Sequence, residues 1–156
     1  FVNTEKYPGF EGRIIWTGGK YNYTKIIESN GEYTLYDSRR TSSPFTYTID
    51  FNRELSFGDS VYFKLETSVK DDNLSMIPIF SHTIRQQTHK FTMHLTVPEN
   101  LIKNIKLNVY KDSARTINAP NDIHIATQKV GNLMQYSFSI NNPTLLNNYC
   151  FEWEFK

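Results

Sequence analysis

The sequence has little of what helices, disulfides and membrane spans require. It contains three alanines among 156 residues and no long apolar run, so it is poor in helix formers and short of the roughly 18 apolar residues that a spanning helix needs. Cys150 is the only cysteine, which excludes a disulfide within the chain. We expect it to be a small packed thiol, and a lone cysteine favours a reducing compartment such as the cytoplasm.

Excess charge of either sign is also lacking. The chain has 17 basic and 16 acidic residues and a net charge of +1. Short pairs such as Arg39-Arg40 do not make the basic stripe that is typical of binding to phosphate backbones. The charge pattern therefore disfavours a nucleic acid as the partner.

What the chain has in quantity is large apolar side chains at every second position. Between residues 149 and 155 an aromatic ring alternates with small or charged residues. Because side chains alternate between the two faces of a strand, this pattern predicts one buried face and one wet face. By the same reasoning strands are expected at residues 13–17, 20–28, 32–37, 45–51, 61–66, 91–97, 105–109, 123–125, 134–140 and 149–155.

Nine or ten short strands without long helical segments between them predict an all-β fold. We expect an antiparallel β-sandwich of the C2-like, Ig-like or jelly-roll type, with a β-barrel as the alternative. Gly18-Gly19 and Asn30-Gly31 are typical of tight turns, so the first three strands are predicted to form a meander. A single helical turn is expected at residues 101–104.

The alternation begins only after the first residues of the chain. Residues 1–11 contain Pro8 and Gly9 and no clear pattern, so they are expected to be a linker. Residues 12–156 fit one domain with a core of its own. Because the chain begins with Phe1, we expect it to be the C-terminal part of a longer protein.

Residues 70–90 have no dependable period and are predicted to be a long loop. Long loops in compact domains are often functional, although a cover over the end of a sandwich is the structural alternative. The candidate binding residues in this segment are Asp71, Asp72, His82, Arg85 and His89.

No group of residues has the spacing of a known catalytic or metal site. Ser60 follows Gly58-Asp59 but enters a predicted strand, whereas a nucleophile elbow lies between a strand and a helix. The four histidines lack metal-ligand spacing, and the adjacent pair Asp71 and Asp72 supplies few of the oxygens that calcium needs. We therefore expect no enzymatic activity, no metal and no cofactor.

Tyrosines on predicted polar faces are the most informative candidates. Tyr36, Tyr62 and Tyr110 each alternate with the core positions of their strands. Tyrosine is enriched at interfaces because it combines a large apolar area with one polar group. The structural alternative is cross-strand pairing, which tyrosine also favours.

These features together predict a non-enzymatic recognition or sensor module within a multidomain protein of the signalling or defence type. Its partner is expected to be a protein or a small ligand. A lectin-like carbohydrate-binding domain and a structural subunit, such as a capsid or fibre component, are the alternatives, because fold class alone does not give function. The sequence does not identify the ligand or the oligomeric state.

Overall fold

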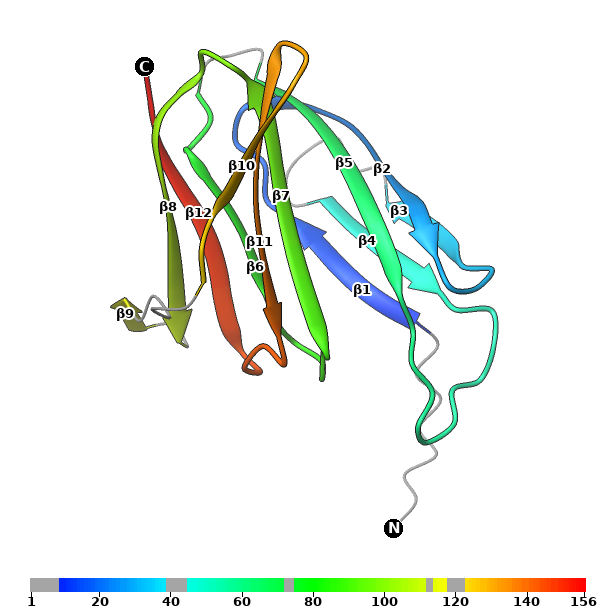
Figure 1. Cartoon of the computed structure of the whole chain (residues 1–156). Helices are drawn as coiled ribbons and strands as arrows, with labels where there is room; N and C mark the ends of the chain where they lie inside the picture. The colour runs from blue at the N-terminus through cyan, green and yellow to red at the C-terminus, as the bar shows by residue number, and fades with distance from the viewer. Residues whose placement is uncertain (1–8, 39–44, 72–74, 112–113, 118–122) are drawn as a thin grey trace. The chain divides into compact units, whose positions relative to one another are not determined.

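The computed structural model describes residues 9–38, 45–71, 75–111, 114–117 and 123–156, and these form an all-β structure (Figure 1). Helices are absent from these ranges, so none of them holds a helix that is long and apolar enough to cross a membrane. The strands are β1 (Gly9–Ile14), β2 (Gly19–Ser29), β3 (Thr34–Ser38), β4 (Phe45–Asp50), β5 (Phe63–Asp71), β6 (Ile79–Thr83), β7 (Lys90–Pro98), β8 (Ile102–Lys111), β9 (Ala114–Ile117), β10 (Ala126–Val130), β11 (Leu133–Asn141) and β12 (Asn147–Phe155).

The chain divides into two compact units, Phe1–Ile77 (unit 1) and Pro78–Lys156 (unit 2). Unit 1 contains a sheet of order β1-β4-β3 and a two-stranded sheet of β2 and β5. Unit 2 contains a sheet of order β10-β11-β7 and one of order β6-β12-β8-β9. Every pairing is antiparallel. None of these four sheets closes on itself among the described strands, so the alternative prediction of a closed barrel is wrong.

The core of unit 1 follows the alternation in β4. Tyr47 and Ile49 of this strand and the adjacent Phe51 are buried together, as the pattern predicted. Strand pairing places Phe10 of β1 and Leu35 of β3 on either side of Ile49. Partly buried side chains of β2 and β5 pack against the same cluster. The two sheets of unit 1 therefore share one core.

An aromatic cluster forms the core of unit 2. The ring of Phe138 on β11 lies 5.3 Å from that of Phe151 and 6.0 Å from that of Tyr149, both on β12. Phe91 of β7 lies 5.8 Å from Phe138. These rings come from both sheets of the unit, and tilted or edge-on contacts at such distances are favourable for aromatic pairs. The strand expected at residues 149–155 is thus confirmed, with Tyr149, Phe151 and Trp153 buried as predicted. Phe155 is 40% exposed, however, and Cys150 on the opposite face is buried.

The predicted meander is wrong. β2 pairs with β5, whereas β1 and β3 both pair with β4. Neither Asn30 nor Gly31 adopts the positive φ that a type I′ turn requires. The Asn30 backbone N–H instead donates to the Tyr62 carbonyl at 3.1 Å. A long-range tie to the residue before β5 therefore replaces the local turn.

The predicted long loop at residues 70–90 is also wrong. β5 continues to Asp71, and β6 occupies Ile79–Thr83 as the edge partner of β12. The first three residues of β6 are all exposed. No alternation of buried and exposed positions therefore marks this segment as a strand. The helical turn expected at residues 101–104 is replaced by a tight turn in which the Leu101 N–H donates to the Pro98 carbonyl at 3.0 Å.

Several strand bounds differ from those predicted. β1 begins at Gly9, inside the segment expected to be a linker. β9 was not predicted, and β10 replaces the strand expected at residues 123–125. All five residues of β10 are exposed. It forms a hairpin with β11 in which Gly131 supplies a φ of 64°, a value that glycine adopts at little cost.

Candidate functional site

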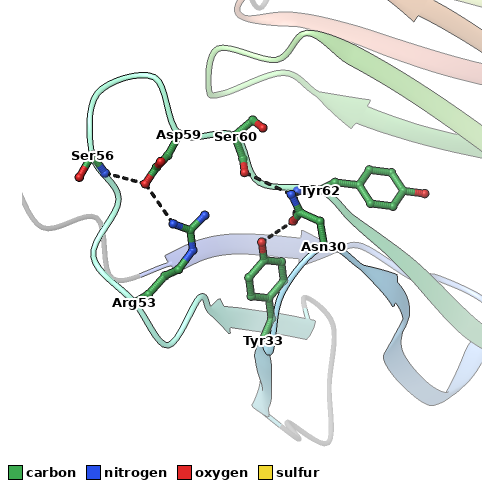
Figure 2. Close-up of polar contacts among 7 residues, drawn as sticks. All are labelled: Asn30, Tyr33, Arg53, Ser56, Asp59, Ser60 and Tyr62. Carbon is green, nitrogen blue, oxygen red and sulfur yellow. Dashed lines mark hydrogen bonds and ion pairs between the residues drawn. The ribbon is translucent and has the colours of Figure 1, made fainter.

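One carboxylate makes two hydrogen bonds within residues 52–62, which lie between β4 and β5. Asp59 Oδ2 accepts hydrogen bonds from the Ser56 backbone N–H at 2.9 Å and from Arg53 Nη1 at 3.0 Å (Figure 2). The Ser56 N–H, and then the Arg53 guanidinium, hold the pKa of the Asp59 carboxyl below its ordinary value. We call residues 52–62 the Phe57 loop.

A β-turn forms the tip of this loop. The Asp59 backbone N–H donates to the Ser56 carbonyl at 3.0 Å, which places Phe57 and Gly58 at the two central positions. Gly58 has a φ of 92°, as the third position of a type II turn requires. The Phe57 side chain is fully exposed, at 108%. The turn therefore holds a large apolar ring in solvent without packing it against the chain.

Asn30 anchors the end of the loop that enters β5. Its Oδ1 accepts from the Tyr62 backbone N–H at 2.8 Å and from the Tyr33 hydroxyl at 2.5 Å. Its Nδ2 donates to the Ser60 carbonyl at 3.3 Å (Figure 2). A single side chain thus bonds to two backbone positions of the loop, which orders the approach to β5.

Asn52 anchors the other end of the loop. Its backbone has a φ of 54°, which asparagine tolerates better than most residues. Its N–H donates to Asp50 Oδ1 at 2.7 Å, and its Nδ2 donates to the Glu32 carbonyl at 2.8 Å and to Thr34 Oγ1 at 3.0 Å. Both ends of the Phe57 loop are therefore tied to the body of unit 1.

The three predicted tyrosines do not lie in one unit. Tyr62 and Tyr36 belong to unit 1 and are 48% and 58% exposed, and Figure 2 shows the Tyr62 ring directed away from Asn30. Partial desolvation, and then a hydrogen bond to Glu28, raise the pKa of Tyr62. Tyr110 belongs to unit 2.

On β8, the Tyr110 hydroxyl is engaged by a neighbouring strand. It donates to Glu152 Oε1 of β12, and this bond is the first cause of its raised pKa. Tyr110 thus makes a cross-strand contact, which was the structural alternative to a binding role for the tyrosines.

Of the two predicted aspartates, the structure describes only Asp71, which has a local structural role. Asp71 accepts hydrogen bonds from the backbone N–H groups of Ser75 at 3.0 Å and Met76 at 3.3 Å, through its two carboxylate oxygens. Asp72 lies outside the described residues. Within the described ranges, no group of three His, Cys, Asp or Glu side chains is arranged to hold a metal ion.

His82 is a core-facing residue of unit 2. Its ring stacks on that of Phe91 at 5.2 Å with an interplanar angle of 28°. Burial, and to a smaller extent the charge of Arg85, lower the pKa of the imidazole. The neutral form that this favours is suited to packing on an aromatic ring.

Arg85 and His89 lie beside a second surface, formed by residues 141–148, which comprise the turn between β11 and β12 and the strand residues that flank it. The segment is joined to the β6–β7 connection by backbone hydrogen bonds: Ile84 N–H to the Asn147 carbonyl at 3.0 Å, Leu146 N–H to the Ile84 carbonyl at 2.7 Å, and Asn142 N–H to the His89 carbonyl at 2.7 Å. We call residues 141–148 the leucine turn.

Two open hollows lie on the leucine turn. One of about 440 Å³ is lined by Thr83, Arg85, Leu146 and Asn148. Another of about 340 Å³ is lined by Gln87, Thr88, His89, Asn142, Pro143 and Leu145. The structure thus brings the predicted residues Arg85 and His89 to the same turn.

The leucine turn holds an unfavourable backbone conformation. Leu146 has a φ of 65°, in the left-handed region that a branched side chain adopts at a cost of roughly 1–2 kcal/mol. Leu145 and Leu146 are 53% and 54% exposed, so only part of each residue is packed. Strain of this kind is found more often at functional sites than elsewhere.

The sequence analysis did not predict the main features of either surface. Phe57 stands directly before the turn signal Gly58-Asp59, so an aromatic ring at a turn tip was visible in principle. Leu145 and Leu146 break the polar run around Pro143, which was a weaker signal. The role of Asn30 could not be found, because Tyr62 is 32 residues away in the sequence.

No protein-family model, curated protein or solved structure matches the chain significantly. Function is therefore inferred from the side chains of these two surfaces.

Proposed function

We propose that this chain is a non-enzymatic recognition module of the β-sandwich class, and that it binds a protein partner through the Phe57 loop. The observation that carries the proposal is the full exposure of Phe57 on a turn that Asp59 fixes. The sandwich class is supported by the packing of β2 and β5 side chains on the Tyr47 and Ile49 core in unit 1.

The loop has the properties of a pre-ordered binding element. Large aromatic side chains that fill a partner's pocket often dominate the energy of an interface. Ordering a mobile loop costs binding free energy, and the bonds from Asp59, Asn30 and Asn52 reduce that cost because the loop is already held. Exposing a phenyl ring does nothing for folding, whereas burying it in a partner is favourable.

The chemistry around the ring favours a protein over other partners. A phenyl ring has no polar atom, so it suits an apolar pocket. The loop contains one cation, Arg53, and two carboxylates, Glu54 and Asp59. The loop therefore offers no surplus of positive charge to attract an anionic bilayer. A protein pocket with an apolar floor and a polar or basic rim fits both the ring and its neighbours.

Site-specific crosslinking tests the proposal. The photoreactive residue benzoylphenylalanine is placed at position 57 of the full-length protein in the cells that express it. We expect one protein to be crosslinked, and expect the purified partner to bind the parent protein in calorimetry. Phe57→Ser should weaken that binding by about thirtyfold, the effect of a typical hot spot.

Ile15→Ser is the matched control, because Ile15 is also an exposed apolar residue of unit 1, at 69%. It should change the affinity by less than about twofold. Equal binding by the parent protein and the Phe57→Ser variant would contradict the proposal. Crosslinking at position 57 that yields no protein partner would contradict it as well.

A further inference from the structure

The leucine turn exposes two adjacent aliphatic side chains at one end of unit 2. The strand ends that meet there are defined by register, because Asn141 pairs with Lys90 and Asn147 pairs with Lys111. Leu145 and Leu146 are each more than half exposed. Leu146 has a φ of 65°, a backbone conformation in which asparagine or glycine would be less strained than leucine. Less than half of the Leu146 area is buried in return for this strain.

The surroundings of the turn are basic. Residues 83–90 and 141–148 contain no aspartate or glutamate, and they include Arg85, His89 and Lys90. Lys111 is added by its pairing with Asn147 on the neighbouring strand. The side chains of Arg85, Lys90 and Lys111 are exposed. The aliphatic tip thus has Arg85 of the β6–β7 connection beside it, and the register brings Lys90 of β7 and Lys111 of β8 to the two ends of the turn.

One hollow is lined by both polar and aliphatic side chains. Arg85, Thr83 and Asn148 line it together with Leu146, so a guanidinium and a hydroxyl lie beside an exposed aliphatic side chain. Guanidinium groups bind phosphate well, because their N–H donors match its oxygens. A ligand that carries a phosphate next to an apolar chain therefore fits this surface.

We infer that the leucine turn docks unit 2 on a bilayer that contains anionic phospholipid. Leu145 and Leu146 enter the interfacial region, and Arg85, Lys90 and Lys111 lie near the head groups. Insertion of apolar side chains together with attraction of cations is the general basis of such binding. A fluid lipid surface also accommodates cations spread over separate strands, whereas a folded acidic partner has to match each one. This surface does not include the Phe57 loop, so the inference is independent of the proposed function.

The test is sedimentation of the full chain with vesicles of phosphatidylcholine alone and of phosphatidylcholine with phosphatidylserine. We expect binding to the second kind only, and a decrease as salt is raised, because the attraction of exposed charges is screened. Leu146→Gly should weaken this binding by about tenfold, since it removes the inserted side chain. Arg85→Gln should weaken it by about fivefold.

Two variants act as controls. Val130→Ser changes an exposed residue of the β10–β11 hairpin in unit 2, at 50% exposure, and should leave vesicle binding unchanged. Phe57→Ser should also leave it unchanged, which separates this inference from the proposed function. Equal sedimentation with both kinds of vesicle, or wild-type binding by the Leu146→Gly variant, would overturn the inference. An absence of vesicle binding would overturn it too, and would leave an acidic protein as the partner to consider for this turn.

Discussion

Asn30 Oδ1 accepts a hydrogen bond from the Tyr62 backbone N–H at 2.8 Å, across 32 residues of sequence. The Asn30 N–H donates in turn to the Tyr62 carbonyl at 3.1 Å. The two residues therefore join the end of β2 to the start of β5 and hold the Phe57 loop at its base. This relationship connects the fold of unit 1 to the surface that we propose for binding.

Asn30→Ala should destabilise the protein by about 1 kcal/mol, because the Tyr62 N–H loses its acceptor and the Ser60 carbonyl loses its donor. Urea denaturation measures the change. Asn22→Ala is the matched control: Asn22 lies on β2, the strand that ends just before Asn30, and its Nδ2 makes an exposed bond to Ser68 Oγ of β5 at 3.1 Å. That variant should stay within about 0.5 kcal/mol of the parent. Equal effects of the two substitutions would show that Asn30 has no special anchoring role.

The Asp59 carboxyl should titrate below its ordinary value of 3.8, because the Ser56 N–H and Arg53 favour its charged form. A carboxyl with a lowered pKa in the folded state contributes stability above its unfolded pKa. That contribution is lost as the pH falls through the folded value. The Ser56 amide signal in an NMR titration reports the event.

The same titration has an internal test. Arg53→Gln should move the midpoint toward the ordinary value without abolishing the shift, because the Ser56 bond, its first cause, remains. A midpoint at or above 3.8 in the parent protein would mean that the turn is not held by Asp59 in solution.

Leu146→Gly should be more stable than Leu146→Ala by about 1 kcal/mol, because both remove the side chain but only glycine adopts a φ of 65° without strain. Thermal or urea unfolding of the two variants gives the difference. The neighbouring Leu145, which has no positive φ, is the control. There alanine should be at least as stable as glycine. The same order at both positions would contradict the strained conformation of Leu146.

Cys150 should be unreactive toward thiol reagents in the folded protein. Its side chain is buried, and burial, followed by the charge of Glu152, raises the pKa of the thiol from 9.0 to about 12. A shift of this size reduces the thiolate fraction near neutral pH by about a thousandfold. Labelling with iodoacetamide should therefore require denaturant.

A folded protein that labels rapidly at Cys150 would contradict this burial. Because the folded pKa is the raised one, the stability linked to the neutral thiol is present below pH 9 and is lost as the pH rises toward 12. Cys150→Ala is the control that should remove this part of the alkaline dependence.

Alternation along the chain predicted the buried faces well, because burial of a strand face follows directly from a period of two. Tyr47 and Ile49 in β4, and Tyr149 and Phe151 in β12, are buried as expected. Strands without alternation were not predicted. β10 has five exposed residues, and a strand without a buried face carries no such signal.

The candidate surfaces were predicted less well. Arg85 and His89 do line the leucine turn, although the segment that carries them includes β6 and is not one long loop. His82 is turned toward the core by its stacking on Phe91. Phe57 and Leu146, which carry the two proposals, belong to no alternating pattern; the turn signal after Phe57 and the polar run around Leu146 were the only local signals.

The sequence by itself determined that the chain is all-β, because its composition and its period of two leave no room for a long amphipathic helix. It also determined many of the buried positions, such as Tyr47, Ile49, Met93 and Phe151. Only the tertiary structure decided that β2 pairs with β5 and that Asn30 meets Tyr62. Pairing depends on contacts between residues far apart in the chain. A local turn signal such as Asn30-Gly31 is overridden when a long-range hydrogen bond satisfies the same backbone groups.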